Sequence, residues 1–578
     1  MINSLLGSGV EINLDNDPFD YLSTLSAAQI KDELKRINAL YTRLKYNRSQ
    51  WEPDWEDVAD HINPHGYKRK DKTPNKGYNS QAKIMNESVQ LASSRSAAGM
   101  QGGMTNKARP WFSLTTTDED LAEQKHIKHW LQKTTETMRG VLIRSNFYKE
   151  AARLYRQEID FGTAAMVAMD DDDDIIRFST QTMGSYYISE GKRGLVEVFV
   201  LEMDMTVRQL VARFGLNRVS ESVKNKWNKG HKEENVPVLW TVEPNEDYKV
   251  GSENPVNMRY RSTYCEKGKE QGLLSLKGFH LFPVMAPRWE KNNQDPWGVG
   301  PGIIAVGGQK ALTLLEKQRS MAHELSIQPP MRASTNMAAR PKSSLPASIT
   351  YTDQNDTWEP AFQPSLDEAG TAQEVREIED RARRVYFEDL FLMISGIDDS
   401  TMTATEVQAR LQERMVVLGP VVETNEDEFL DPLIDILYDT CWRRGLIDDP
   451  PEELIDQKLK LEHTSVLAQA QKAGGITLLD RYIGSLANIA SVTGDPSVFD
   501  NLNEDKAAER YGTLIGIDAE VQNSPQEVAQ IRAERQKQIQ QQQQMEVAMQ
   551  TAQAAKTLSD TSMEGNNALT QAITGGAV

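Results

Sequence analysis

The stretch Thr401-Met402-Thr403-Ala404-Thr405-Glu406-Val407 contains the start signal of a helix that follows a turn-rich segment. Thr403 and Glu406 form an S/T-x-x-E capping box, in which each residue satisfies a backbone amide of the first helical turn. Apolar residues then recur at helical spacing and predict one buried stripe: Val407, Leu411, Met415 and Leu418. Residues 395–400, Ser-Gly-Ile-Asp-Asp-Ser, predict a short acidic loop between this helix and an earlier one. An ordinary helix hairpin has the same local pattern.

Length and charge place the chain among large, acidic, multidomain proteins. Its 578 residues carry 84 acidic and 65 basic side chains, a formal net charge of −19 at pH 7. Hydrophobic residues make up 39% and the mean hydropathy is −0.56, which favours several polar-surfaced domains with sizeable cores. No apolar run reaches the ~18 residues of a membrane span, and the N-terminus lacks a secretory pattern. We expect a cytosolic protein without membrane association.

The acidic balance also bears on nucleic-acid binding. Proteins that read DNA sequence normally carry a basic surface that displaces counterions from the phosphates. A net charge of −19 therefore argues against tight DNA binding, although DNA can pass along an acidic wall that does not hold it. Acidity that only keeps a large protein in solution is the alternative interpretation, and composition does not choose between them.

The candidate motifs for catalysis and for metal binding fail in their context. Two cysteines, Cys265 and Cys441, are too few for a disulfide framework or a cysteine-based zinc site. Asp160-Phe161-Gly162 spells the kinase metal-binding triplet without the other kinase motifs, so we predict that it leads into a strand. No G-x-x-x-x-G-K-[ST] loop occurs. Two histidine pairs have metal-ligand spacing but no third ligand: His61/His65 and His126/His129. We expect no enzyme activity, no cofactor and no metal.

The pattern of the chain predicts an α+β fold in which helices predominate. Between about 160 and 285 the hydrophobic period is two, which predicts half-buried antiparallel strands. The run Asp170–Asp174 separates two strand-like segments and is predicted to be a hairpin turn. Trp111 and Phe112 are predicted to be core residues. The first helices are predicted over about 27–61, 81–100 and 121–142.

Two long helices with an excursion between them are predicted after Gly298. The glycine-rich turn Trp297–Gly302 leads into the first helix, which ends before Pro329-Pro330, and the second helix begins near Ala372. The second helix has a narrow apolar seam: Val375, Ile378, Ala382 and Val385.

The ordered set of these elements resembles the portal (head-to-tail connector) proteins of short-tailed, podovirus-type bacteriophages. The most similar segments are the helix start at TATEV and the Pro110-Trp111-Phe112-x-Leu114 strand that follows a helix and a turn. The resemblance covers roughly residues 25–535. It implies a portal-type protomer with an N-terminal arm (1–25), a wing of helices and antiparallel sheet (26–300), stem helix 1 (301–327), a small β clip (328–371), stem helix 2 (372–394), a tunnel loop (395–402), wing-return and crown helices (403–523), a C-terminal barrel helix (524–558) and a disordered tail (559–578).

The resemblance also implies a function and partners. Proteins of this family form a ring, a dodecamer, at one capsid vertex of the virion. The ring is the conduit for DNA packaging and ejection, and it is assembled with capsid and scaffolding proteins in the host cytoplasm. It docks the terminase, which hydrolyses ATP, and later a tail adaptor protein at the clip. A closed ring would also bury apolar seams that a single helix pair exposes.

Two groups of candidate site residues follow from position in this assignment. The first group faces the channel and contacts double-stranded DNA loosely: Ile397, Asp398, Asp399 and Ser400. The second group could contact phosphates or the adaptor, with salt bridges between subunits as the alternative: Lys310, Lys317, Arg319, Arg332 and Arg340.

Two other functions compete with the portal assignment. A different virion component, from the tail or an internal core, would share oligomerisation but not the order of helix, clip, helix, loop and helix. A multidomain enzyme would need a concave site with perturbed carboxylates or histidines.

Overall fold

The computed structural model describes residues 21–559 with gaps. The longer gaps are 70–82, 339–353, 362–367, 395–416, 466–481 and 508–524, and the others span one to four residues. Within these ranges none of the helices combines the length and apolar composition needed to cross a bilayer.

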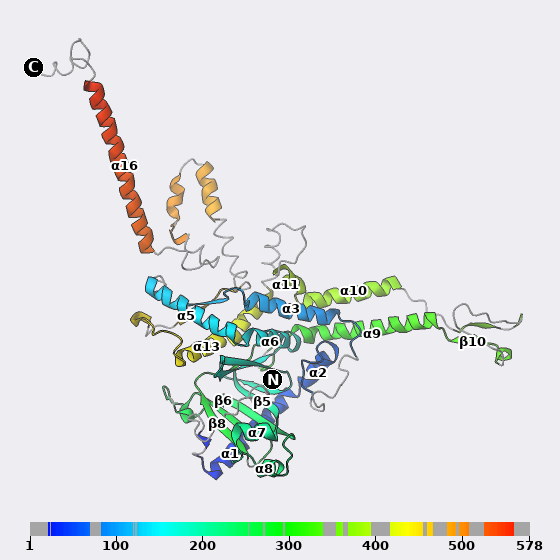
Figure 1. The fold of residues 1–578 in the computed structure, drawn as a ribbon. Coiled ribbons are helices and arrows are strands. Elements are labelled where there is room, and N and C mark those ends of the chain that lie inside the picture. Colours follow the sequence, from blue (N-terminus) through cyan, green and yellow to red (C-terminus); the bar gives the residue numbers. More distant parts are fainter. Residues whose placement is uncertain are drawn as a thin grey trace, which may run out of the picture.

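A five-stranded antiparallel sheet packs with the first long helix of the chain (Figure 1). Helix α1 (Ala27–Arg48) begins at a capping box between Ser26 and Gln29, and its apolar side, including Ile37 and Leu44, packs on one face of the sheet. The short helices α7 (Val207–Phe214) and α8 (Glu221–Asn228) lie in the chain between the second and third strands of this sheet. In spatial order the strands are β4 (Tyr186–Glu190), β5 (Val196–Thr206), β6 (Asn235–Pro244), β7 (Tyr260–Glu266) and β8 (Leu273–Phe279).

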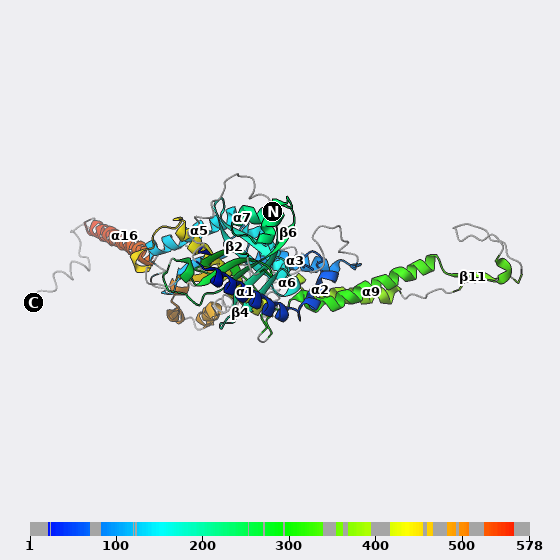
Figure 2. The same ribbon diagram turned by 90° about the horizontal axis from the view of Figure 1, so that it is seen from below.

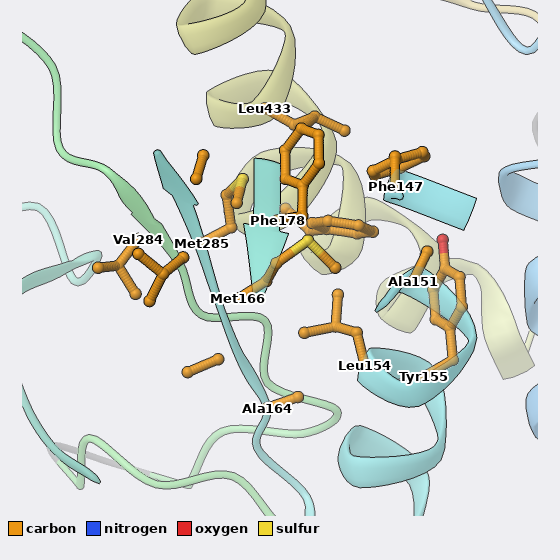
Figure 3. Close-up of a cluster of buried hydrophobic side chains, with 14 of the residues drawn as sticks. Phe147, Ala151, Leu154, Tyr155, Ala164, Met166, Phe178, Val284, Met285 and Leu433 are labelled. Carbon is orange, nitrogen blue, oxygen red and sulfur yellow. The ribbon is translucent and has the colours of Figure 1, made fainter. Parts of the chain in front are cut away.

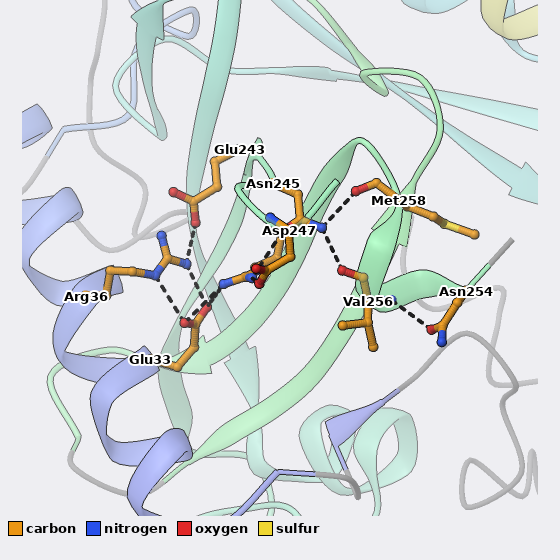
Figure 4. A network of polar contacts seen from close by, with 9 residues as sticks. Glu33, Arg36, Glu243, Asn245, Asp247, Asn254, Val256 and Met258 are labelled. Carbon is orange, nitrogen blue, oxygen red and sulfur yellow. Dashed lines mark hydrogen bonds and ion pairs between the residues drawn. The ribbon is translucent and has the colours of Figure 1, made fainter. Parts of the chain in front are cut away.

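A charged network ties α1 to this sheet (Figure 4). The Arg36 guanidinium donates hydrogen bonds of 2.6 Å to Glu33 and 2.6 Å to Glu243. Arg261 donates to the Glu33 carboxylate at 3.4 Å. Burial alone would raise the pKa of Glu33, but the hydrogen bonds and charges of Arg36 and Arg261 hold it below its usual range. The network therefore favours one register of α1 on the sheet.

The larger core lies where several helices meet a three-stranded sheet (Figure 3). Met166 and Phe178 from two of its strands point toward Leu154 of α6 and Leu433 of α13. The strands are β3 (Ile175–Gln181), β2 (Ala165–Asp171) and β9 (Val284–Met285). The helices around them are α2 (Glu52–His61), α3 (Ser88–Met104), α5 (Lys125–Arg144), α6 (Phe147–Phe161) and α13 (Asp431–Arg443).

The end of α6 and the start of α9 (Pro301–Ile327) pack backbone against backbone, because glycines lie where they cross. Gly162 caps α6 at φ 77°, a left-handed conformation that glycine adopts without strain. A Cβ on Gly302 would overlap the backbone oxygen of Asp160 and lie 2.7 Å from its Cα, and a Cβ on Gly300 would lie 2.7 Å from the Ile159 carbonyl oxygen. The direction of α9 is thus set by direct contact with α6.

Helix α9 extends away from the body beside α10 (Glu368–Val385), which runs back in the opposite direction (Figures 1 and 2). The 27 residues of α9 give a length of about 40 Å. A small antiparallel hairpin of β10 (Met331–Ala333) and β11 (Trp358–Pro360) lies at the far end of the pair. Helix α11 (Glu388–Ile394) follows α10 after a short interruption of the helical conformation.

The remaining described segments return along the body. A helix over 417–425 continues as a π-helix, Glu426–Leu430, which leads into α13. Strand β12 (Leu459–His463) pairs antiparallel with β1 (Phe112–Thr116). A helix over 482–492 and the long helix α16 (Pro525–Ser559) complete the described chain.

The structure confirms several predicted elements and corrects others. Asp170–Asp174 contributes the turn between β2 and β3, and Trp111 and Phe112 are each 1% exposed. The helix predicted over 27–61 is two helices, since α1 ends at Arg48 and α2 begins at Glu52. As predicted, Asp160-Phe161-Gly162 leads into a strand, since β2 begins at Ala165. Asp160 and Phe161 end α6, whose buried side packs in the larger core.

We expect Gly302→Ala to lower the free energy of unfolding by about 1–3 kcal/mol, the usual cost of overpacking, because the methyl group would overlap the α6 backbone. Gly140→Ala, within α5, is the matched control, since a Cβ there meets no atom within 4 Å. It should be neutral or stabilise the helix by up to about 1 kcal/mol. Chemical denaturation of both variants measures the difference, and equal stability would contradict the close crossing.

Candidate connector site

Helices α9 and α10 pack along a shared apolar seam within one protomer. Ala305 and Leu312 of α9 are 5% and 0% exposed, and Val375, Ile378 and Ala382 of α10 are 5–8% exposed. The α10 seam was predicted to be exposed in a single protomer, and this is wrong. The physical reason is that α9 lies alongside α10 and covers it.

A second apolar face of α9 remains uncovered in the protomer. Ile304, Leu314 and Met321 are 57%, 56% and 51% exposed. They are ten and seven residues apart, so all three can occupy a and d positions of one heptad seam. This face, which we call the outer seam (Ile304, Leu314 and Met321), is an apolar surface of α9 that the protomer leaves more than half exposed.

Three of the five candidate cations already have carboxylates beside them within the chain. Lys310 Nζ lies 2.6 Å from Asp57 of α2, and Arg332 Nη2 lies 2.5 Å from Glu359 across the β10–β11 hairpin. Arg319 is 3.9 Å from Glu316, one turn earlier on α9. Two others remain. Lys317 is exposed and forms no ion pair within the described part of the chain, and Arg340 lies outside the described residues.

The break between α10 and α11 is held tightly against α3. Phe387 has φ 55°, a left-handed conformation that is rare for a bulky side chain. Ser96 Oγ donates a hydrogen bond of 2.5 Å to the Tyr386 carbonyl oxygen, and Arg95 pairs with Glu388 on the other side of the break. The second helix was predicted as one segment over 372–394. The structure starts it at Glu368 and redirects it at Phe387.

The four predicted channel residues, Ile397, Asp398, Asp399 and Ser400, lie outside the described residues, as do Thr403 and Glu406 of the predicted capping box. The structure describes the chain on both sides of them. It enters this segment from α11, beside α3, and leaves it into the helix over 417–425.

The segment that leaves is clamped by a buried arginine that the sequence analysis did not identify. Arg288, in the loop between β9 and α9, is fully buried and donates to both oxygens of Glu428 in the π-helix, with Nε–Oε2 at 2.9 Å. It also pairs with Glu190 of β4. Burial raises the pKa of Glu428, and Arg288 offsets part of this effect. No local pattern marks Arg288, because its partners lie 98 and 140 residues away in the chain.

The geometry suits assembly. Within the described residues no three His, Cys, Asp or Glu side chains come together where a metal ion would bind. The described part of the protein has a long helix pair with one exposed apolar face and a two-stranded hairpin at its far end. The residues just before and just after 395–416 are held by contacts with the body of the protein.

Comparison with known proteins agrees with this architecture. The family described as bacteriophage head to tail connecting protein matches residues 34–522. The portal protein of Salmonella phage epsilon15 is 35% identical, and the probable portal protein of Bordetella phage BPP-1 is 30% identical. Each alignment covers 93% of this chain and 97% of the relative.

Two solved structures are more distant. A chain from the virion of a native gene transfer agent particle is 13% identical, with a TM-score of 0.32 over 69% of this chain and 84% of that one. A chain from the neck of an empty gene transfer agent particle is 12% identical, with a TM-score of 0.30 over 69% and 90%. The assignment rests on the family match and the phage relatives: the chain belongs to the family of bacteriophage head-to-tail connecting, or portal, proteins, which are structural components of the head–tail junction.

Proposed function

We propose that copies of this chain close into a ring, a dodecamer, that forms the portal at one capsid vertex. The ring is the conduit through which DNA is packaged and ejected. It serves as the attachment point for the terminase during packaging and afterwards for a tail adaptor protein at the β10–β11 end. The chain supplies no catalysis, and ATP hydrolysis belongs to the terminase. Assembly takes place in the host cytoplasm with capsid and scaffolding proteins.

The observation that carries this proposal is the outer seam of α9. Burial of apolar side chains contributes roughly 25 cal/mol per Å², and the protomer leaves Leu314 and Met321 more than half exposed. Because α10 already covers the inner seam, the outer seam needs a surface from outside the protomer. A neighbouring copy in a cyclic ring supplies one at every position with no unpaired end.

The charges of the chain support a loose contact with DNA. The proposed channel segment, Ile397 to Ser400, contributes two aspartates and no cation, in a chain of net charge −19. Such a wall releases few counterions from DNA, so it does not hold the polymer. Lys310 and Arg332 are engaged with Asp57 and Glu359, which favours a structural role for these two cations. Of the five candidate cations, Lys317 is the described one that remains for a phosphate, an adaptor or a second subunit.

Electron microscopy of the purified protein, with native mass determination on the same sample, tests the proposal. Rings of about a dozen subunits with a central channel wide enough for duplex DNA are expected. A stable monomer or compact dimer that persists at high concentration and with capsid and scaffolding proteins present would contradict it.

The double substitution Leu314→Glu and Met321→Glu should abolish rings, because it places repeated carboxylates along the outer seam. It should change protomer stability by no more than about 0.5 kcal/mol, since both side chains are exposed. Val250→Glu is the control, because Val250 is 88% exposed in a loop of the wing region. Native mass spectrometry reads the assembly and thermal unfolding reads the fold. Rings that persist in the double variant would exclude the outer seam as the interface.

Deletion of residues 397–400 should leave the ring intact and reduce DNA packaging or retention, because the segment is proposed to line the channel. A variant with Asp398→Asn and Asp399→Asn keeps the loop length and separates the effect of charge from that of length. Packaged DNA per particle is the measurement, and ring formation is the control. Loss of rings on deletion would instead assign this segment to assembly.

A further inference from the structure

Two fully buried polar side chains meet where the segment returning from residue 416 packs on α6. Glu158, in the last turn of α6, and Asn425, one residue before the π-helix, are both 0% exposed. Asn425 Nδ2 donates a hydrogen bond of 2.7 Å to Glu158 Oε1. This contact joins parts of the chain that are 267 residues apart.

The orientation of the Asn425 amide is determined by a second contact. Nδ2 also donates to the carbonyl oxygen of Val421 at 3.0 Å, and a carbonyl oxygen can only accept. The other amide atom is therefore the acceptor Oδ1. Among the described residues, neither this Oδ1 nor Glu158 Oε2 has a hydrogen-bond partner. Two buried acceptors without donors are costly, and one proton between them would satisfy both.

We propose that Glu158 keeps its proton at neutral pH and donates it from Oε2 to Asn425 Oδ1, which closes a neutral acid–amide pair of two hydrogen bonds. The pair locks the residues before the π-helix onto the end of α6, the same turn that packs against α9. It is a proton-dependent joint between the α9 rod and the segment that returns from residue 416. The inference rests on these contacts alone and does not require that the chain form a ring.

The surroundings of Glu158 favour the protonated form. The pKa of Glu158 is raised from 4.5 to about 8, mainly because the carboxyl is buried; the hydrogen bond from Asn425 lowers it and the charge of Glu428 on the π-helix raises it. Tyr155, on α6 itself, is a further titratable neighbour. Arg288, the nearby cation on the loop before α9, is already occupied by Glu428 and Glu190.

The π-helix gives this joint a structural role. A π-helix contains an extra residue relative to an α-helix, and such insertions persist where tertiary contacts hold them. Here Asn425 is held by Glu158 on one side, and Glu428 is held by Arg288 on another. When Glu158 loses its proton, one hydrogen bond is lost and a buried charge appears, so the register over Asn425–Leu430 loses one of its two anchors.

The pH dependence of stability tests the proposal. Between pH 4.5 and about 8 the unfolded chain has ionised Glu158 while the folded chain keeps its proton, so the folded state binds one more proton. Stability therefore falls as the pH rises through this window and levels off above it. Glu158→Gln cannot titrate and can keep both hydrogen bonds, because its amide oxygen accepts from Asn425 Nδ2 and its N–H donates to Asn425 Oδ1. We expect the folded-to-unfolded ratio of the wild type, relative to Glu158→Gln, to fall by about tenfold per pH unit in this window.

Glu136→Gln is the matched control, because Glu136 is exposed on α5, and it should follow the wild type at every pH. Parallel pH curves for the wild type and Glu158→Gln would overturn the proposal.

If Glu158→Gln does not fold, infrared spectra of the wild type decide the question. A carboxylic acid C=O band should disappear above about pH 8 and, in Asn425→Leu, should shift to higher frequency. A wild-type spectrum without such a band at neutral pH would also overturn it.

Discussion

The direct backbone contact between the end of α6 and the start of α9 is the constraint on which the rest of the structure depends. Glycines let the two helices approach so closely that a methyl group on Gly302 would overlap α6. The same last turn of α6 also carries Asp160, which accepts hydrogen bonds from Asn63 at 2.7 Å and Arg156 at 2.6 Å, and Glu158, which meets Asn425. One helical turn thus connects the loop that follows α2, the α9 rod and the returning segment.

The two faces of α9 have different environments in the protomer. The inner face of α9, as far as Leu312, packs on α10 and belongs to the protomer core. The outer seam is more than half exposed in the protomer and is accessible to another molecule. Because the α6 contact fixes the direction of α9, the outer seam is presented in a defined orientation, and preorganisation of this kind lowers the cost of association.

The ion pairs in the core are buried, whereas those on the rod and at its tip are partly exposed. In the core, Arg288 balances Glu428 and Glu190, and removal of one member of such a buried set leaves an uncompensated charge. On the rod and its tip, Lys310 and Arg332 form partly exposed pairs, which are worth about 0–1 kcal/mol each. The buried arginine therefore helps to decide the conformation of the returning segment, whereas the exposed pairs can exchange partners at small cost.

Local pattern and turn chemistry by themselves determined much of this protein. The aspartate turn at Asp170–Asp174, the core positions of Trp111 and Phe112, and the long helix after the glycine-rich turn all follow from neighbouring residues, because periodicity and backbone preference act over a few positions. Only the tertiary structure decided that the α10 seam is covered by α9, and that Glu158 meets Asn425 267 residues later. Such pairings depend on where the fold brings distant segments together, and no local period encodes that.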